Sequence, residues 1–148
     1  GLADELLARL AALIPAGHGI GGLMQAADAL PAERILVVLI SDFEHAPDEL
    51  DRLLAALRPR PVLPVWLRDS GLEAPGPRLG LAGIRDPETG VRRTVLTTRR
   101  WAERQAQATA DRHAGLLRVF ARHGLRPVPI IDSIQVADLA ASLDEAPL

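Results

Sequence analysis

The sequence predicts an α/β fold built on a mainly parallel sheet. Strand-like and helix-like segments alternate from residue 35 onward, an order typical of proteins in which helices connect parallel strands. The run Ile35–Ile40 consists entirely of apolar residues, as expected for a strand that is buried on both faces. The helical segments carry leucines three and four residues apart, which gives each helix one apolar face.

The first half of the chain is predicted to contain three helices and two strands. A proline stands directly behind each of the first two helices and ends it. Pro47 stands at the first position of the third helix, and Asp48 and Glu49 occupy its first turn, where carboxylates are favoured. In chain order, the predicted elements are the helices Leu2–Ile14 and Leu23–Leu30, the strand Ile35–Ile40, a helix that begins at Pro47 and carries leucines up to Leu57, and the strand Val62–Leu67.

The second half is predicted to begin with an inserted β-hairpin near residues 81–97. Two short extended runs, Leu81–Asp86 and Val91–Thr97, flank the turn sequence Pro-Glu-Thr-Gly. Thr98 is the expected N-cap of a long helix, and Gly124 is the expected stop signal behind it. The remaining predicted elements are the helix Arg99–His123, the strand Val128–Ile131 and a final helix, Ile134–Leu143, capped by Ser133.

The composition of the 148 residues is that of one domain and excludes several kinds of chemistry. All 17 basic residues are arginine and cysteine is absent, so Schiff-base enzymes, P-loop NTPases and thiol chemistry are excluded. The net charge of −2 argues against nucleic acid as a partner. No apolar run approaches the roughly 20 residues of a membrane span. We expect a soluble, cytoplasmic domain, or one on the cytoplasmic face of a membrane if upstream residues carry an anchor.

The segment Gly17–Gly22 reads GHGIGG and fits the pattern G-x-G-x-x-G of dinucleotide-binding folds. That pattern requires a strand directly before its first glycine, whereas the preceding segment here has the leucine spacing of a helix. We therefore interpret the glycines as a tight connection that needs positive φ or a close approach of the backbone.

Several segments occur in the order and spacing of the C-terminal part of a bacterial von Willebrand factor A-like domain. They are VVLISDF (Val37–Phe43), the leucine-rich helix behind it, IRDPETG (Ile84–Gly90) and the long arginine- and alanine-rich helix. Over nearly all of its length the chain resembles the family called domain of unknown function 58. The resemblance implies a three-layer, Rossmann-like sheet whose N-terminal strands are missing, so that residues 1–148 form a single, partial domain. We expect either that residues upstream of Gly1 carry those strands or that the chain forms a homodimer through the edge Ile35–Ile40.

The resemblance also implies a metal-ion-dependent adhesion site at the carboxyl edge of the sheet. It places Asp42, with Ser41 beside it, at the position of a metal-binding aspartate, and it places GHGIGG in a loop that usually carries a threonine. This loop has no threonine, and the family's D-x-S-x-S segment does not occur in the chain. Mg²⁺ prefers six oxygen ligands, so we expect a degenerate or incomplete site with no cofactor or with weakly bound Mg²⁺.

The function that the resemblance implies is a non-enzymatic protein-interaction module associated with a MoxR-type AAA+ ATPase. The expected partner-binding residues lie in loops at the ends of strands: Gly19, Gly21, Gly22, Asp42, Glu44 and His45. The alternative is a small metal-dependent α/β hydrolase that uses Asp42, His45 and His18 as its ligands. The other two histidines, His113 and His123, are expected at the surface of the long helix.

Overall fold

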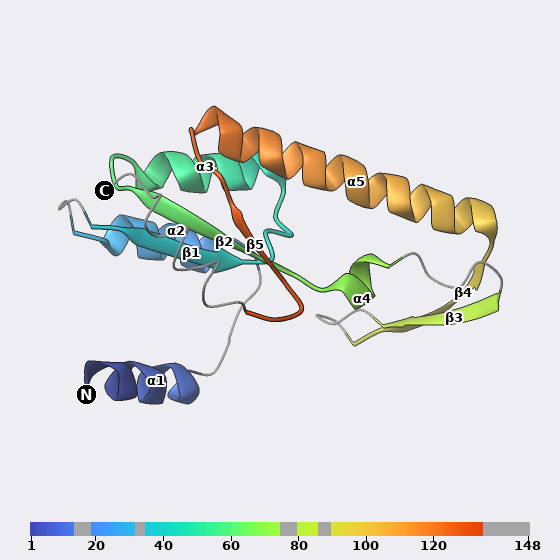
Figure 1. Cartoon of the computed structure of the whole chain (residues 1–148), viewed down its shortest axis with the longest axis horizontal. Coiled ribbons are helices and arrows are strands. Elements are labelled where there is room, and N and C mark those ends of the chain that lie inside the picture. The colour runs from blue at the N-terminus through green and yellow to red at the C-terminus, as the bar shows by residue number, and fades with distance from the viewer. Residues whose placement is uncertain (14–18, 32–34, 75–79, 86–89, 135–148) are drawn as a thin grey trace.

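The computed structural model describes residues 1–13, 19–31, 35–74, 80–85 and 90–134 (Figure 1). The last predicted helix, Ile134–Leu143, runs into residues that lie outside this part. The described elements are α1 (Leu2–Ala12), α2 (Gly21–Ala29), β1 (Val37–Ser41), α3 (Pro47–Leu57), β2 (Val62–Arg68), α4 (Ser70–Glu73), β3 (Gly80–Arg85), β4 (Arg92–Thr97), α5 (Arg99–Arg122) and β5 (Val128–Ile131). None of the helices in the described residues combines the length and the apolar character that a membrane span needs.

The sheet at the centre of the fold has three parallel strands in the order β1-β2-β5. Val37 of β1 lies opposite Val62 of β2, and Val65 of β2 lies opposite Val128 of β5. The prediction of an α/β fold with a parallel sheet is therefore confirmed. The first strand begins at Val37 instead of Ile35 and continues to Ser41, so its polar end reaches further toward the carboxyl edge than expected.

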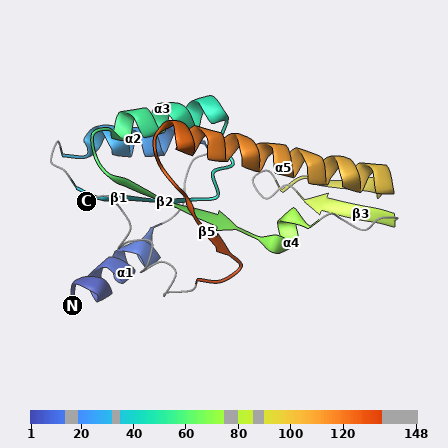
Figure 2. The same cartoon turned by 45° about the horizontal axis from the view of Figure 1, so that its top comes forward.

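Three helices, α2, α3 and α5, cover one face of this sheet (Figure 2). The side chains of Leu39 and Trp66 point from the sheet into the same apolar cluster as Phe120 of α5. Leu63 and Val65 of the central strand point to the opposite face and are buried too, as expected for a strand covered on both sides.

The predicted third helix is confirmed as α3. Pro47 is its first residue, and the carboxylate of Glu49 accepts a hydrogen bond from the backbone N–H of Ala46 at 3.3 Å. Its leucines recur at i, i+3, i+4 and i+7, which places all of them on the face that packs against the sheet. They are among the most buried side chains in the described residues: Leu50, Leu53, Leu54 and Leu57.

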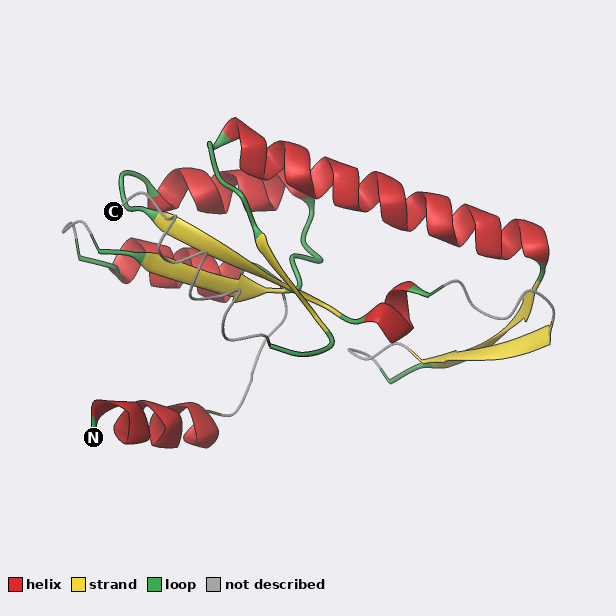
Figure 3. Cartoon of the chain, in the orientation of Figure 1, coloured by secondary structure: helices red, strands yellow, loops and turns green. Residues whose placement is uncertain are grey.

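The predicted hairpin and long helix are also confirmed. Strands β3 and β4 pair antiparallel, and they lie beside the N-terminal part of α5, away from the three-stranded sheet (Figure 3). The hydroxyl of Thr98 accepts a hydrogen bond from the backbone N–H of Trp101 at 3.2 Å, so Thr98 is the N-cap of α5. Behind the helix, Gly124 has a φ of 71°, a conformation that glycine adopts at little cost.

The apolar face that the leucine spacing predicts for α1 is exposed, since no residue of α1 is buried. His123 was expected at the surface, yet only 10 % of its side chain is exposed, because Nε2 lies 3.0 Å from Oδ1 of Asp51 between α5 and α3. The hydrogen bond with His123 holds the pKa of Asp51 below its usual value.

We expect Leu53→Ala to lower the free energy of unfolding by about 2–5 kcal/mol, because Leu53 is 1 % exposed and truncation leaves a cavity. Leu72→Ala is the matched control, since Leu72 is 85 % exposed and its truncation should change the value by less than about 0.5 kcal/mol. Urea unfolding followed by circular dichroism measures both. Equal effects of the two substitutions would contradict the described core.

Candidate functional site

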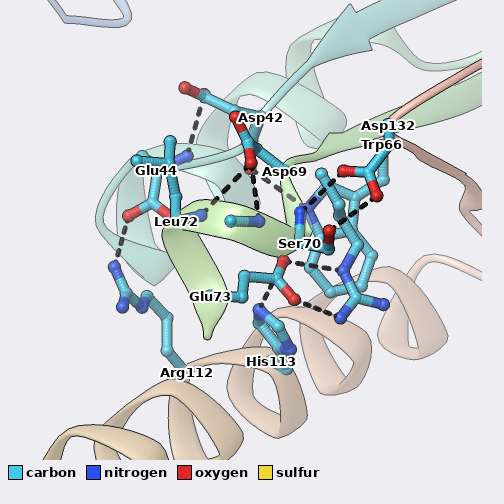
Figure 4. Close-up of polar contacts among 12 residues, drawn as sticks. Asp42, Glu44, Trp66, Asp69, Ser70, Leu72, Glu73, Arg112, His113 and Asp132 are labelled. Carbon is cyan, nitrogen blue, oxygen red and sulfur yellow. Dashed lines mark hydrogen bonds and ion pairs between the residues drawn. The ribbon is translucent and has the colours of Figure 1, made fainter. Parts of the chain in front are cut away.

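An aspartate directly follows each of the three parallel strands. Asp42 follows β1, Asp69 follows β2 and Asp132 follows β5. The carboxyl ends of parallel strands meet at one edge of a sheet, where ligands of open α/β sheets collect. The three carboxylates therefore belong to one edge, and Figure 4 shows them around the short helix α4. We use the term rim for this edge together with α4 and the two α5 residues drawn beside it in Figure 4, Arg112 and His113.

A pocket of about 260 Å³ opens at the rim. It lies between the ends of β1 and β2, the helix α4 and one turn of α5. Its wall combines apolar side chains with carboxylates, one guanidinium, one imidazole and one indole. The lining residues are Asp42, Glu44, Trp66, Leu67, Arg68, Asp69, Leu72, Glu73 and His113.

Two of the three aspartates hold α4 in place. Asp69 is the N-cap of this helix, and its Oδ1 accepts hydrogen bonds from the backbone N–H groups of Gly71 and Leu72 at 2.8 and 3.2 Å. Asp132 accepts from both the backbone N–H and the hydroxyl of Ser70, at 2.8 and 2.6 Å. These bonds to Ser70 lower the pKa of Asp132. Both carboxylates are therefore engaged within the protein.

A bidentate ion pair joins β2 to the end of α4. Arg68 donates from Nε and Nη2 to the two carboxylate oxygens of Glu73, at 2.8 and 2.5 Å. The hydrogen bond from Arg68, reinforced by its charge, lowers the pKa of Glu73 and raises that of Arg68. About a quarter of each side chain is exposed, so water screens this pair less than a surface pair.

Trp66 connects the loop after β1, the strand β2 and the helix α5. Its indole is 6 % exposed, and Nε1 donates to the backbone carbonyl of Asp42 at 3.2 Å. The guanidinium of Arg68 lies 4.9 Å from the ring centroid, within the range of a cation–π contact. The ring of His113 on α5 meets the indole edge-on at 4.8 Å, and Nε2 of His113 lies 3.6 Å from Glu73.

The loop after β1 presents its carboxylates to solvent while its aromatic side chain points inward. Phe43 is 4 % exposed and has a φ of 53°, a left-handed conformation that is unusual for an aromatic residue. Its backbone N–H donates to Oγ of Ser41 at 3.0 Å, and the N–H of Glu44 donates to Oδ1 of Asp42 at 3.2 Å. The carboxylate of Glu44 pairs with Arg112 of α5. The loop is thus a fixed turn with Asp42 and Glu44 on its outer side.

The predicted metal ligands do not converge in the described residues. Ser41 and Asp42 adjoin, but Oγ of Ser41 and Oδ1 of Asp42 both take part in the local turn. His45 is half-buried in the loop before α3, and His18 lies outside the described residues. In the part of the chain that is described, no group of three histidine, aspartate or glutamate side chains could hold a metal ion.

The described part of the glycine-rich segment, Gly19–Gly22, leads into α2. Gly19 has a φ of 79°, which confirms that a positive φ is needed there. Gly21 and Gly22 are the first residues of α2, and a Cβ on either would meet no atom within 4 Å, so close packing does not require them. The described element that precedes the glycines is the helix α1 (Leu2–Ala12), as the leucine spacing predicts. These three glycines do not line the pocket, and their role in partner binding stays a prediction.

Sequence reasoning did not identify the polar residues that line the inner wall of the pocket. His113 was expected at the surface, which is wrong, because only 23 % of its side chain is exposed and it contacts Trp66 and Glu73. Nothing in the spacing of Arg68 and Glu73 indicates that they pair. A signal for the rim was nevertheless present, since an aspartate directly behind each predicted parallel strand marks residues that share an edge.

We expect Arg68→Gln to raise the pKa of Glu73 toward its usual value of about 4.5, because the guanidinium that favours the carboxylate is removed. A carboxyl whose pKa is lowered by folding stabilises the folded chain at pH values above its usual pKa, and this stabilisation is lost as the pH falls through the lowered pKa. The variant lacks this contribution, so it should lose less stability on acidification. Carbon-detected NMR titration of the Glu73 carboxyl measures the pKa.

Arg99→Gln is the control for this titration, because Arg99 forms an exposed ion pair with Glu103 outside the rim. It should leave the pKa of Glu73 unchanged. If Arg68→Gln also left that pKa unchanged, the ion pair described at the rim would be absent in solution.

Comparison with known proteins gives one clear relative. A protein of Paracoccus denitrificans described as "uncharacterized protein in moxR 3′ region" is 73 % identical over 101 residues, which cover 68 % of this chain and 96 % of that protein. No protein-family model matches the chain. No solved structure matches it either.

Proposed function

The chain belongs to the family of the uncharacterized protein in the moxR 3′ region of Paracoccus denitrificans, and from this we propose that it is a non-enzymatic protein-interaction module that works with a MoxR-type AAA+ ATPase. The gene context of the relative supports the association with a MoxR system. The resemblance to von Willebrand factor A-like domains supports the kind of module, because such domains bind partners at the carboxyl edge of their sheet. Here that edge is the rim.

The observation that carries this proposal is that the rim is fixed in shape by its own polar groups. Asp69 and Asp132 are engaged in holding α4, and Glu73 is engaged by Arg68. Groups held in this way cannot readily serve as a general base or a metal ligand. They do form a rigid surface, which lowers the entropy cost of binding a partner.

Asp42 and Glu44 are the rim carboxylates that we assign to direct contact with the partner. Both residues are exposed, and both lie in the turn that Phe43 anchors. Their charge suits a basic segment of the partner, which would be drawn to the rim over a distance of about one Debye length, ~8 Å in physiological salt. Glu44 can exchange Arg112 of its own chain for a cationic group of the partner.

The adhesion site of the family is, in this proposal, degenerate. Ser41 and Asp42 carry three side-chain oxygens, whereas Mg²⁺ requires about six. Water molecules and a carboxylate of the partner would complete the ligand shell of any Mg²⁺ bound here. We therefore propose that the isolated chain binds no metal or binds Mg²⁺ weakly.

We expect the double substitution Asp42→Asn with Glu44→Gln to weaken binding to the MoxR protein of Paracoccus denitrificans by at least about tenfold. Asparagine at position 42 keeps an oxygen that can accept the hydrogen bond from the backbone N–H of residue 44. The turn is therefore preserved while two negative charges are lost. Biolayer interferometry with immobilised chain, at two salt concentrations, measures the affinity.

Asp28→Asn serves as the matched control, because Asp28 is exposed on α2 and lies outside the rim. It should leave the affinity unchanged. Absence of binding by the unmodified chain, or equal binding by the rim double variant, would contradict the proposal.

Titration calorimetry with Mg²⁺, Mn²⁺ and Zn²⁺ tests the non-enzymatic part of the proposal. We expect weak or no heat for each metal and the same result in Asp42→Ala, since the described ligands are too few. Tight Zn²⁺ binding that is lost in Asp42→Ala would instead support the hydrolase built on Asp42, His45 and His18.

A further inference from the structure

The strand β1 has a free lateral edge in the described structure. Its hydrogen-bonded neighbour there is β2, on one side only. Edge strands of natural proteins usually carry a lysine, a proline or a bulge that prevents pairing with another chain. The sequence of β1, Val-Val-Leu-Ile-Ser, contains none of these. An unguarded apolar edge of this kind favours the addition of another strand.

Two apolar side chains of β1 are exposed on one face of the sheet. Val38 and Ile40 of β1 are 46 % and 60 % exposed. Leu63 and Val65 of the neighbouring strand β2 lie opposite them on the same face, yet they are 5 % and 2 % exposed. The cover over this face is therefore incomplete on the side of β1, where a further strand would lie.

The helix α1 is a second element whose apolar face is exposed. Its leucines, with Leu13 behind it, are between 54 % and 81 % exposed: Leu2, Leu6, Leu7, Leu10 and Leu13. An isolated helix of 11 residues is marginal in water, so α1 needs a surface on which to pack. Figure 2 shows α1 on the side of the sheet opposite α2, α3 and α5, which is the side to which Val38 and Ile40 point.

We propose that two copies of this chain pair antiparallel along β1 and that the α1 helices pack over the joint. A two-fold axis perpendicular to the sheet makes the contact self-complementary and produces a continuous six-stranded sheet. Val38 and Ile40 of both copies then form one apolar stripe on a single face. The leucines of the two α1 helices cover this stripe.

The available area suits a stable dimer. The five leucines, with Val38, Ile40 and Leu67, present eight partly or largely exposed aliphatic side chains per chain. At about 100 Å² each they offer on the order of 800 Å² per partner, which is the size of a standard stable interface. Folding α1 back onto its own sheet would cover part of this surface, but it would leave the backbone N–H and C=O groups on the free edge of β1 unpaired. Pairing with a second copy covers the apolar side chains and also provides hydrogen-bond partners for these backbone groups.

The test is the oligomeric state of the 148-residue chain, measured by size-exclusion chromatography with light scattering over a range of concentrations. We expect a dimer at about 10 µM and a shift of at least about tenfold toward monomer in Ile40→Lys, because the charge would lie in the joint. Circular dichroism should be unchanged, since Ile40 is exposed in the monomer. Leu117→Lys on α5 is the control, with the same exposure as Val38, and should remain dimeric.

The double variant Leu6→Asp with Leu10→Asp tests the part played by α1. We expect it to weaken the dimer by at least about tenfold as well. A monomer at about 100 µM, or a dimer that Ile40→Lys does not weaken, would overturn the proposal. A dimer that is not weakened by Leu6→Asp with Leu10→Asp would overturn the role of α1 in covering the joint. None of these results depends on the MoxR partner, so this proposal can fail independently of the proposed function.

Discussion

The contact between Phe43 and Phe120 fixes the geometry of the rim. The two rings meet edge-on with centroids 5.0 Å apart, and both side chains are almost fully buried. Their burial offsets the left-handed backbone of Phe43, which costs on the order of 1–2 kcal/mol. Because Phe43 points inward at that φ, its neighbours Asp42 and Glu44 must point outward. The packing of α5 on the sheet thus determines where the exposed carboxylates lie.

The same edge carries a second left-handed residue, Asp132, with a φ of 61°. Within the described residues these two are the positive-φ positions that are not glycine, and each lies one or two residues behind the end of a parallel strand. Backbone strain of this kind persists where the surrounding structure compensates for it and is often found at functional sites. Here the hydrogen bonds from Ser70 to Asp132 supply that compensation, and they also attach α4 to β5. The rim is therefore a preformed surface.

Elements whose signals are local could be predicted from the sequence. Pro47 and the leucine spacing defined α3, and Thr98 with Gly124 defined α5 to within one residue. The site was predictable only in part, because Asp42 follows an obvious strand whereas His113 reaches the pocket from the middle of a helix with no local signal. The exposed face of α1 could not be predicted either. Periodicity identifies an apolar face but does not show whether another element lies against it.

The account rests on the claim that the rim is the surface that meets the partner. Chemical-shift mapping tests this most directly: ¹⁵N-labelled chain is titrated with unlabelled MoxR ATPase, and each backbone amide reports on its own surroundings. The account predicts shifts concentrated in residues 41–46, 69–73, 112–113 and 132, at the carboxyl edge of the sheet. Shifts confined to the β3–β4 hairpin and the first turns of α5, with the rim unchanged, would contradict it.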